Sequence, residues 1–269
     1  MASGSGLRRP RGEGAAPGIF VALGCVAAVF FLLPLAGLIV HAPWSNAIRE
    51  LTRPAALDAL RLSLIVSFSS LLLSFVFGLP LAWLLSRKRF PGRRVLRGLV
   101  LVPMVLPPVV GGVALLTAFA RFGLLGAALE RVGITLPFTP AGAVVAATFV
   151  SSPFLIVVLE GGFSSVDRRL EGAAATLGAS RARILRTVTL PAMWPAISAG
   201  AALCWARALG EFGATITFNG NIQGRTQTLP LDVYQTLQTD FDGAITLSLL
   251  LLAVALVVLI SLRGNLRVR

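Results

Sequence analysis

Long apolar runs separated by short polar segments dominate the chain. The first run, residues 18–40, has no charged residue; at about 1.5 Å of rise per residue, a helix of this length reaches roughly 35 Å, enough to cross a bilayer. Five further runs have the length and apolarity of membrane spans: 59–86, 95–120, 139–163, 191–217 and 241–262. The pattern predicts an all-α integral membrane protein with six transmembrane helices.

Basic residues are distributed unevenly among the segments between these runs. Four alternate segments, 1–17, 87–97, 168–186 and 263–269, hold 17 arginines and lysines, whereas the three others hold five. Because cytoplasmic loops are enriched in basic residues, both termini and segment 168–186 are expected in the cytoplasm. The net charge of +13 could also indicate nucleic-acid binding, but its placement between apolar runs favours membrane topology, so no nucleic-acid partner is expected.

Composition divides the chain into one membrane domain and two short tails. Residues 1–17 are rich in Gly, Ala and Arg and predict a disordered, basic cytoplasmic tail. Residues 18–262 predict the six-helix domain, with a cytoplasmic loop at 164–190, and residues 263–269 predict a second cytoplasmic tail. The chain is therefore expected to be a multi-pass protein of the cytoplasmic membrane, in contact with lipid.

The inventory of reactive side chains is small. The two cysteines, Cys25 and Cys204, lie inside apolar runs without metal-ligand spacing, and the single histidine, His41, lies at the end of a run. The only lysine, Lys88, is not part of a nucleotide-binding glycine loop. We expect no metal site, no cofactor and no enzymatic activity, and a membrane-embedded enzyme is the weaker alternative. If ATP drives this protein, another chain must bind it.

Residues 171–191 form a polar stretch between apolar runs, and the positions of its capping and turn residues predict two short helices joined by a turn. Asp167 and Ser180 are suited to cap the two helix starts, and Gly178 stands where a helix end requires positive φ. Pro191 is expected to begin the next helix. On pattern alone, this stretch is an amphipathic connector at the membrane surface.

The spacing within this stretch resembles the EAA motif of the permeases of ABC importers. That motif reads E-x-A, four residues, G, nine residues, and I-x-L-P; Gly172 and Val188 are the small departures. The resemblance implies an ATPase-coupling role for Glu171, Ala173, Ala174, Gly178, Leu190 and Pro191, of which Ala174 lies in the four-residue gap of the motif. The resemblance implies a type I permease fold and a coupling helix that docks on an ATPase subunit. It also implies a homodimer, two ATPase subunits that bind ATP and Mg, and an extracytoplasmic substrate-binding protein.

Three prolines interrupt the run 95–120. Pro103, Pro107 and Pro108 precede two glycines, and each proline removes a helix hydrogen bond. A packing kink is one interpretation. We favour a helix that lines a translocation path, because a single kink requires fewer breaks.

Two opposite charges lie inside the run 191–217. Arg207 and Glu211 are four residues apart, so on one helix they would share a face and could pair. A structural ion pair and a contact with a transported anion are equally compatible with this spacing.

The segment 219–230 is polar and rich in neutral hydrogen-bond donors, as a solvated outer loop would be. However, RALGEFGATITF, which contains Thr215, together with NIQGRTQTLPL resembles the oxyanion branch of the permease family. That branch comprises molybdate, tungstate and sulfate importers, and TQTLPL favours molybdate. Within the second segment we expect substrate-path roles for Asn221, Thr226, Gln227 and Thr228. The resemblance extends over about residues 57–262.

The sequence thus predicts a permease subunit that moves a tetrahedral oxyanion, with molybdate favoured. Sulfate or thiosulfate, tungstate, another solute, and a membrane scaffold without transport remain alternatives.

Overall fold

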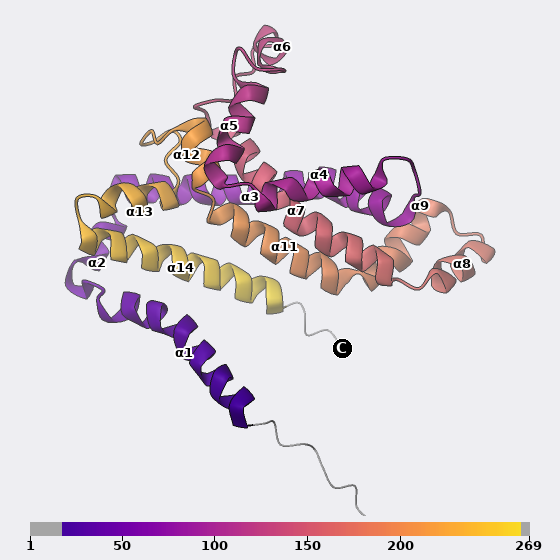
Figure 1. Ribbon diagram of the computed structural model, residues 1–269, viewed down its shortest axis with the longest axis horizontal. Helices are drawn as coiled ribbons and strands as arrows, with labels where there is room; N and C mark the ends of the chain where they lie inside the picture. The colour runs from indigo at the N-terminus through magenta and orange to yellow at the C-terminus, as the bar shows by residue number, and fades with distance from the viewer. Residues whose placement is uncertain (1–17, 265–269) are drawn as a thin grey trace, which may run out of the picture. The chain divides into compact units, whose positions relative to one another are not determined.

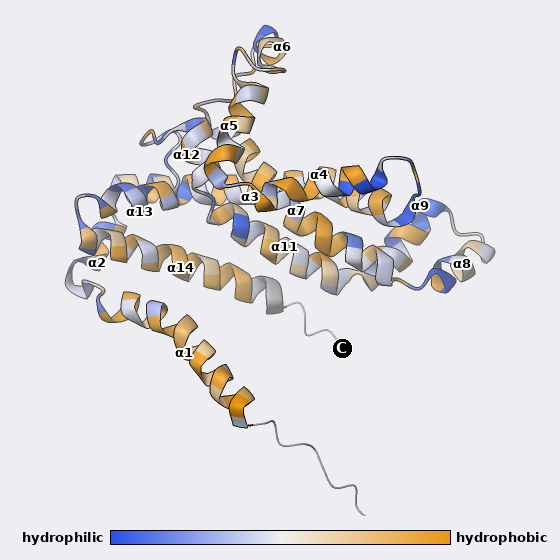
Figure 2. Ribbon diagram, viewed as in Figure 1, coloured by the Kyte–Doolittle hydropathy of each residue, from blue (hydrophilic) through white to orange (hydrophobic). Residues whose placement is uncertain are grey.

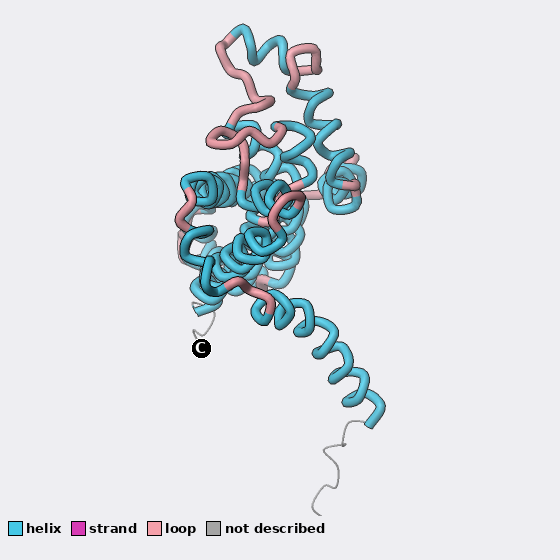
Figure 3. The backbone as a smooth tube through the Cα atoms, turned by 90° about the vertical axis from the view of Figure 1, so that its left-hand side faces the viewer, coloured by secondary structure: helices cyan, strands magenta, loops and turns pink. Residues whose placement is uncertain are grey.

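The computed structural model describes residues 18–264, and the side chains of 18–261. The tail predicted to be disordered, 1–17, and residues 265–269 lie outside the described part. Every regular element within that part is helical (Figure 3). The described chain forms two separate units, one ending at Ala42 and one beginning at Pro43. The first contains helix α1 (Gly18–Val40), an apolar helix with Pro34 inside it.

The second unit contains the other helices. They are α2 (Trp44–Leu51), α3 (Pro54–Arg87), α4 (Arg93–Val105), α5 (Pro108–Phe119), α6 (Gly126–Arg131), α7 (Pro140–Ser165), α8 (Arg168–Thr176), α9 (Arg181–Ile184), the π-helical turn η1 (Leu185–Thr189), α10 (Leu190–Ala192), α11 (Trp194–Leu209), α12 (Gly213–Asn219), α13 (Leu229–Leu237) and α14 (Phe241–Gly264).

Helices α3, α7, α11 and α14 run alongside one another as the body of this unit (Figure 1). Helices α8 and α9 lie at one end of this body, and α2 and α13 lie at the opposite end (Figure 1). Apolar residues cover the long helices, whereas polar residues concentrate in α8, α9 and the link between α3 and α4 (Figure 2). The stretch with the EAA spacing and the polar segment 219–230 therefore belong to different ends of the unit.

Small residues explain the close packing of α3 against α7. Four serines lie three or four residues apart on α3 and are all buried, which places them in one stripe: Ser63, Ser67, Ser70 and Ser74. Between apolar helices, small side chains let the backbones approach, and hydroxyls can bond across the gap. Ser70 does so by donating to the carbonyl of Val144 on α7, at 3.1 Å.

Two of the predicted spans are broken. The run 95–120 forms α4 and α5, because Pro107 and Pro108 cannot continue a helix and instead start a new one. The run 191–217 forms α10, α11 and α12, with a bend of 73° between residues 181–192 and 194–209. Among the described residues, four helices are long and apolar enough to cross a membrane, or five if the bent pair is counted as one span.

The prediction that Pro191 begins a helix was wrong. The helical run continues from Arg181 to Ala192, and η1 ends at Thr189, two residues before the proline. The wider π turn accommodates the proline ring, which in a regular α-helix would clash with the carbonyl of Thr187, four residues earlier. The break comes two residues later, at Met193.

Candidate functional site

The stretch with the EAA spacing folds as two capped helices and a left-handed turn. Asp167 accepts from the backbone N–H of Arg169 at 2.9 Å, and Ser180 accepts from that of Arg183 at 3.3 Å. Gly178 has a φ of +81°. The N–H of Gly178 bonds to the carbonyl of Ala175, and the next N–H bonds to that of Ala174, which is the pattern of a Schellman C-cap. The predicted caps and turn are confirmed.

Glu171 connects this stretch to the body of the unit. Its Oε1 lies 2.9 Å from Nη2 of Arg87, at the end of α3, and accepts a hydrogen bond of 2.7 Å from Thr189 Oγ1. Thr189 is buried and Arg87 nearly so. One carboxylate thus connects α8, α3 and η1. These partners were not predictable from local spacing, because they lie 84 and 18 residues away from Glu171.

The outer face of α8 and its C-cap residue, Leu177, carry exposed apolar side chains. Leu170 is 55% exposed and Leu177 is 88% exposed, and Ala173 between them is also exposed. Ala174 is half-buried. The two leucines are seven residues apart, so they follow one side of the helix. Sequence reasoning did not single them out, although apolar residues at this spacing in a polar stretch could have indicated a contact surface.

The end of the stretch is partly enclosed. Leu190 is half-buried and Pro191 is exposed, whereas Met193 at the bend is buried in the main apolar core. A displacement of α8 would therefore act on the bend through η1 and α10.

Arg207 and Glu211 pair, as predicted, with 2.7 Å between Nη1 and Oε2. They do not share one helix, because α11 ends at Leu209 and Glu211 lies in the link to α12. The second oxygen of Glu211 accepts from the backbone N–H of Ala214 at 2.8 Å and so caps the start of α12. The Glu211 side chain is 2% exposed and that of Arg207 is 29% exposed. Glu211 thus fixes both the arginine and the α11–α12 link.

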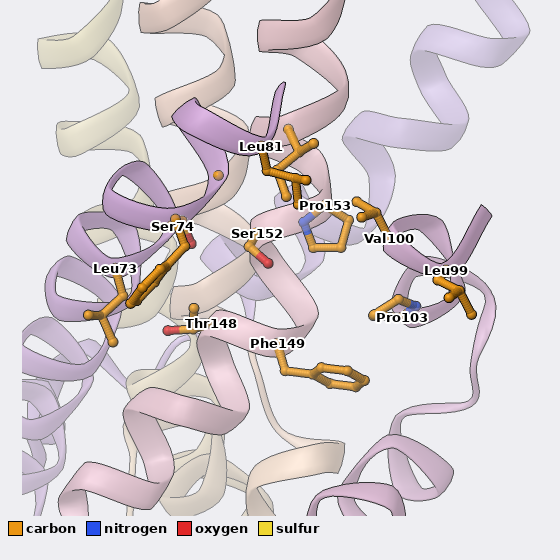
Figure 4. Close-up of a pocket in the computed structure, with 13 residues that line it drawn as sticks. Leu73, Ser74, Leu81, Leu99, Val100, Pro103, Thr148, Phe149, Ser152 and Pro153 are labelled. Carbon is orange, nitrogen blue, oxygen red and sulfur yellow. The ribbon is translucent and has the colours of Figure 1, made fainter. Parts of the chain in front are cut away.

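The three predicted path prolines occupy different environments. Pro108 lies against Gly213, where a Cβ would collide with the proline ring, so α5 meets α12 two residues from Glu211. Gly112 lies equally close to α12 one turn further along α5. Pro107 is the N-cap of α5, and Pro103 lines a separate cavity with Phe149 of α7 (Figure 4). Thr215, on α12, is buried.

The segment 219–230 is only partly the solvated loop that its composition suggests, because residues 222–225 are exposed whereas the residues that follow them are buried. Thr226, Gln227 and Thr228 are all buried. Thr226 accepts from the N–H of Ile222 at 3.0 Å. Asn221, which is half-buried, and Gln227 both donate to Oε1 of Gln235 on α13, at 2.9 and 2.8 Å.

These side chains hold the backbone of the segment, and the exposed Arg225 is the cation that the segment presents. Near the end of the segment, the backbone N–H of Leu229 donates a hydrogen bond of 2.7 Å to Ser63 Oγ of α3. Arg225 was not among the predicted site residues.

A small polar cavity of about 200 Å³ lies beside this segment. Its wall includes Arg53 and Asp232, whose nearest atoms are 3.9 Å apart, and Arg53 also pairs with Glu50 at 2.9 Å. Burial raises the pKa of Asp232, and the charge of Arg53 opposes that rise. Since Asp240 lines the same wall, acids outnumber the base, and the cavity is poorly suited to a dianion.

Within 18–261, no group of three or more His, Cys, Asp or Glu side chains could hold a metal ion. The chemistry that these sites offer is ion pairing, hydrogen bonding and docking.

The known proteins that resemble this chain are membrane components of transport systems. The family described as "Binding-protein-dependent transport system inner membrane component" matches residues 74–266. The molybdenum transport system permease protein ModB of Mycobacterium tuberculosis is 45% identical over 232 residues, covering 86% of this chain and 88% of that protein. Its Escherichia coli counterpart is 44% identical over 206 residues, 76% and 90% of the two chains. The sulfate transport system permease protein CysT of E. coli is 35% identical over 253 residues, 91% of each.

Two solved structures share the fold. A bacterial ABC transporter that imports the acidic polysaccharide alginate aligns with a TM-score of 0.74 at 18% identity, covering 92% of this chain and 94% of that one. An inward-facing MetNI methionine ABC transporter aligns with a TM-score of 0.57 at 20% identity, covering 78% and 91%.

Proposed function

Because this chain belongs to the family of binding-protein-dependent transport system inner membrane components, we propose that it is the permease subunit of an ATP-driven molybdate importer. The observation that supports molybdate as the substrate is the 45% identity to a molybdenum permease over most of both chains. The sulfate permease is more distant, at 35%. The chain is a multi-pass, non-enzymatic membrane component, and a separate subunit hydrolyses ATP.

We infer six spans with both termini in the cytoplasm, as the basic residues suggest. In this arrangement α4 and α5 form one broken span, and the helices from α10 to α12 form another. The permease domain is then 18–262, with the family core at 57–262, a coupling loop at 164–190, and cytoplasmic tails at 1–17 and 263–269.

Reporter fusions test this topology. Fusions after Arg131 and Arg225 are expected to report the outside, and fusions after Arg94 and Arg186 the inside. An outside signal after Arg186 would overturn the coupling role, since the ATPase is cytoplasmic.

We further propose that α8 docks on the ATPase subunit. Leu170 and Leu177 expose apolar area that this chain does not bury, and a groove on the partner would remove it from water. The functional unit is a homodimer with two ATPase subunits, which bind ATP and Mg, and an extracytoplasmic binding protein delivers the anion.

The contacts of Glu171 suggest how docking affects the spans. When the ATPase pair closes on ATP, a shift of α8 is transmitted to α3 through Arg87 and to η1 through Thr189. Because the chain bends by 73° at Met193, α10 can move along its own axis without moving α11 in the same direction. The opposite end of α11 meets the anion path at Arg207, whose charge Glu211 largely cancels. The anion therefore depends on hydrogen-bond donors as well as on charge.

Competition uptake separates the candidate anions. Uptake of labelled molybdate by cells that express the full importer should fall with excess molybdate or tungstate and resist an equal excess of sulfate. Equal competition by sulfate would instead favour the function of the sulfate relative.

A further inference from the structure

The link between α3 and α4 folds around a basic hollow of about 420 Å³. Four arginines form most of its wall: Arg89, Arg93, Arg94 and Arg97. Among the side chains that the structure describes, one carboxylate pairs with them. Glu160 of α7 pairs with Arg97 and lies 4.0 Å from Arg93. Arg89 and Arg94 are exposed, and no carboxylate within residues 18–261 pairs with either. The hollow therefore has an excess of positive charge.

An apolar cavity of about 310 Å³ lies further along α4 (Figure 4). Val100 and Pro103 of α4 lie across it from Phe149 and Pro153 of α7, and Leu81 of α3 contributes to its wall. Its polar side chains are three hydroxyls, Ser74, Thr148 and Ser152, and that of Thr148 bonds to the carbonyl of Val144. An aliphatic chain would suit this lining.

The hollow and the cavity follow one another between α4 and α7. Arg97 borders the hollow, and Val100, three residues later, borders the cavity, a rise of about 4.5 Å. On α7, Glu160 pairs with Arg97, and Ile156, one turn earlier, lines the cavity. The Arg97–Glu160 pair therefore marks the boundary between a basic space and an apolar one.

We propose that this composite site binds one anionic phospholipid, with its phosphate among the arginines and part of an acyl chain in the cavity. Guanidinium groups bind phosphate oxygens in forked geometry, and basic clusters at helix ends attract acidic lipid headgroups. Trp83, with the Lys88 ammonium 5.7 Å from its ring, is of the kind found at the membrane interface.

A bound lipid would also support α4. None of the residues of α4 is buried within this chain, so its position depends on few protein contacts. The site lies at the same end as Glu171, which is tied to Arg87 next to the hollow. Lipid bound there would hold α4 against α7 close to the coupling stretch. This inference does not depend on which anion the protein carries.

The test is native mass spectrometry of the purified full chain, titrated with phosphatidylglycerol or phosphatidylcholine of identical acyl chains. The wild type should prefer phosphatidylglycerol. Arg89→Gln/Arg94→Gln should weaken phosphatidylglycerol binding roughly thirtyfold, about fivefold per arginine, and leave phosphatidylcholine unchanged. The control Arg181→Gln/Arg183→Gln removes two exposed charges outside the hollow and should keep the preference. The proposal is wrong if the two double variants lose phosphatidylglycerol binding equally, or if Arg89→Gln/Arg94→Gln loses none.

Two further arms separate lipid from free phosphate. Ser152→Leu fills the apolar cavity and should weaken both lipids severalfold while the preference between them remains. Glycerol phosphate, a soluble headgroup, should not displace phosphatidylglycerol at an equal concentration. If it does, or if Ser152→Leu has no effect, the hollow is a phosphate site without a lipid tail and the proposal is wrong. Arg89→Lys/Arg94→Lys, which keeps the charge, should retain most of the preference; its loss to the level of the Gln pair would also contradict the proposal.

Discussion

Replacing Gly178 tests whether the turn after α8 is needed for coupling. The glycine has a φ of +81°, and nothing lies within 4 Å of the position that a Cβ would occupy. A side chain there meets no steric obstacle from the surroundings. Within this chain, the effect of a substitution is therefore expected to come from the backbone conformation rather than from a clash.

The size of the effect follows from the left-handed conformation. For a residue with a Cβ, this region costs about 1–2 kcal/mol, and a β-branched residue lies towards the upper end of about 1–3 kcal/mol. Since about 1.4 kcal/mol corresponds to a factor of ten, a cost of about 2 kcal/mol depopulates the turn roughly thirtyfold. The two hydrogen bonds of the C-cap, at 3.0 and 3.1 Å, are lost when the turn opens.

Three variants separate conformation from size. Gly178→Val should weaken co-purification of the ATPase and lower substrate-stimulated ATP hydrolysis by about tenfold or more. Gly178→Asn, which tolerates positive φ, should stay close to the wild type although its side chain is as large. Gly178→Ala should lie between them. The yield of folded permease serves as the control and should be equal for all three.

The reasoning is refuted if Gly178→Val and Gly178→Asn behave alike. Equal loss would indicate that size matters and that the partner needs the open space. Equal retention would indicate that the turn does not contribute to docking.

Three other predictions concern the contacts that join the helices. Arg207→Met leaves the buried Glu211 carboxylate unpaired and should cost about 3 kcal/mol in detergent unfolding; adding Glu211→Gln should recover stability but not uptake, and full uptake in the double variant would remove both from the path. Glu171→Gln keeps an acceptor for Thr189 and should couple better than Glu171→Ala in the ATPase assay; equal activity would mean that the carboxylate contacts are dispensable. Burial raises the pKa of Asp232, which lies outside the candidate spans, so its contribution to stability is largest at acidic pH and falls as pH rises through that pKa. Asp232→Asn should flatten this dependence, and an unchanged pH profile of thermal unfolding would contradict the assignment.

Features set by neighbouring residues were predictable from the sequence. Asp167, Gly178 and Ser180 each act on backbone groups within four residues, so their roles as caps and turn were visible in the spacing. The pairing of Arg207 with Glu211 was visible for the same reason.

Features set by distant residues were not predictable. A hydropathy run such as 191–217 is equally apolar whether straight or bent, so the 73° bend left no signal. The polar composition of 219–230 suggested solvent, but Ser63 and Gln235 supply hydrogen-bond partners that let the second half of the segment be buried. The Glu171 contact with Arg87 likewise spans 84 residues.

ATP-driven uptake in proteoliposomes tests the central claim most directly. Vesicles contain this chain with its ATPase, and labelled molybdate and the binding protein are added on the side opposite to ATP. The account predicts molybdate accumulation that requires ATP, is competed by tungstate, and falls about tenfold with Gly178→Val but not with Gly178→Asn. Accumulation without ATP, or none with an assembled and ATP-hydrolysing complex, would contradict it.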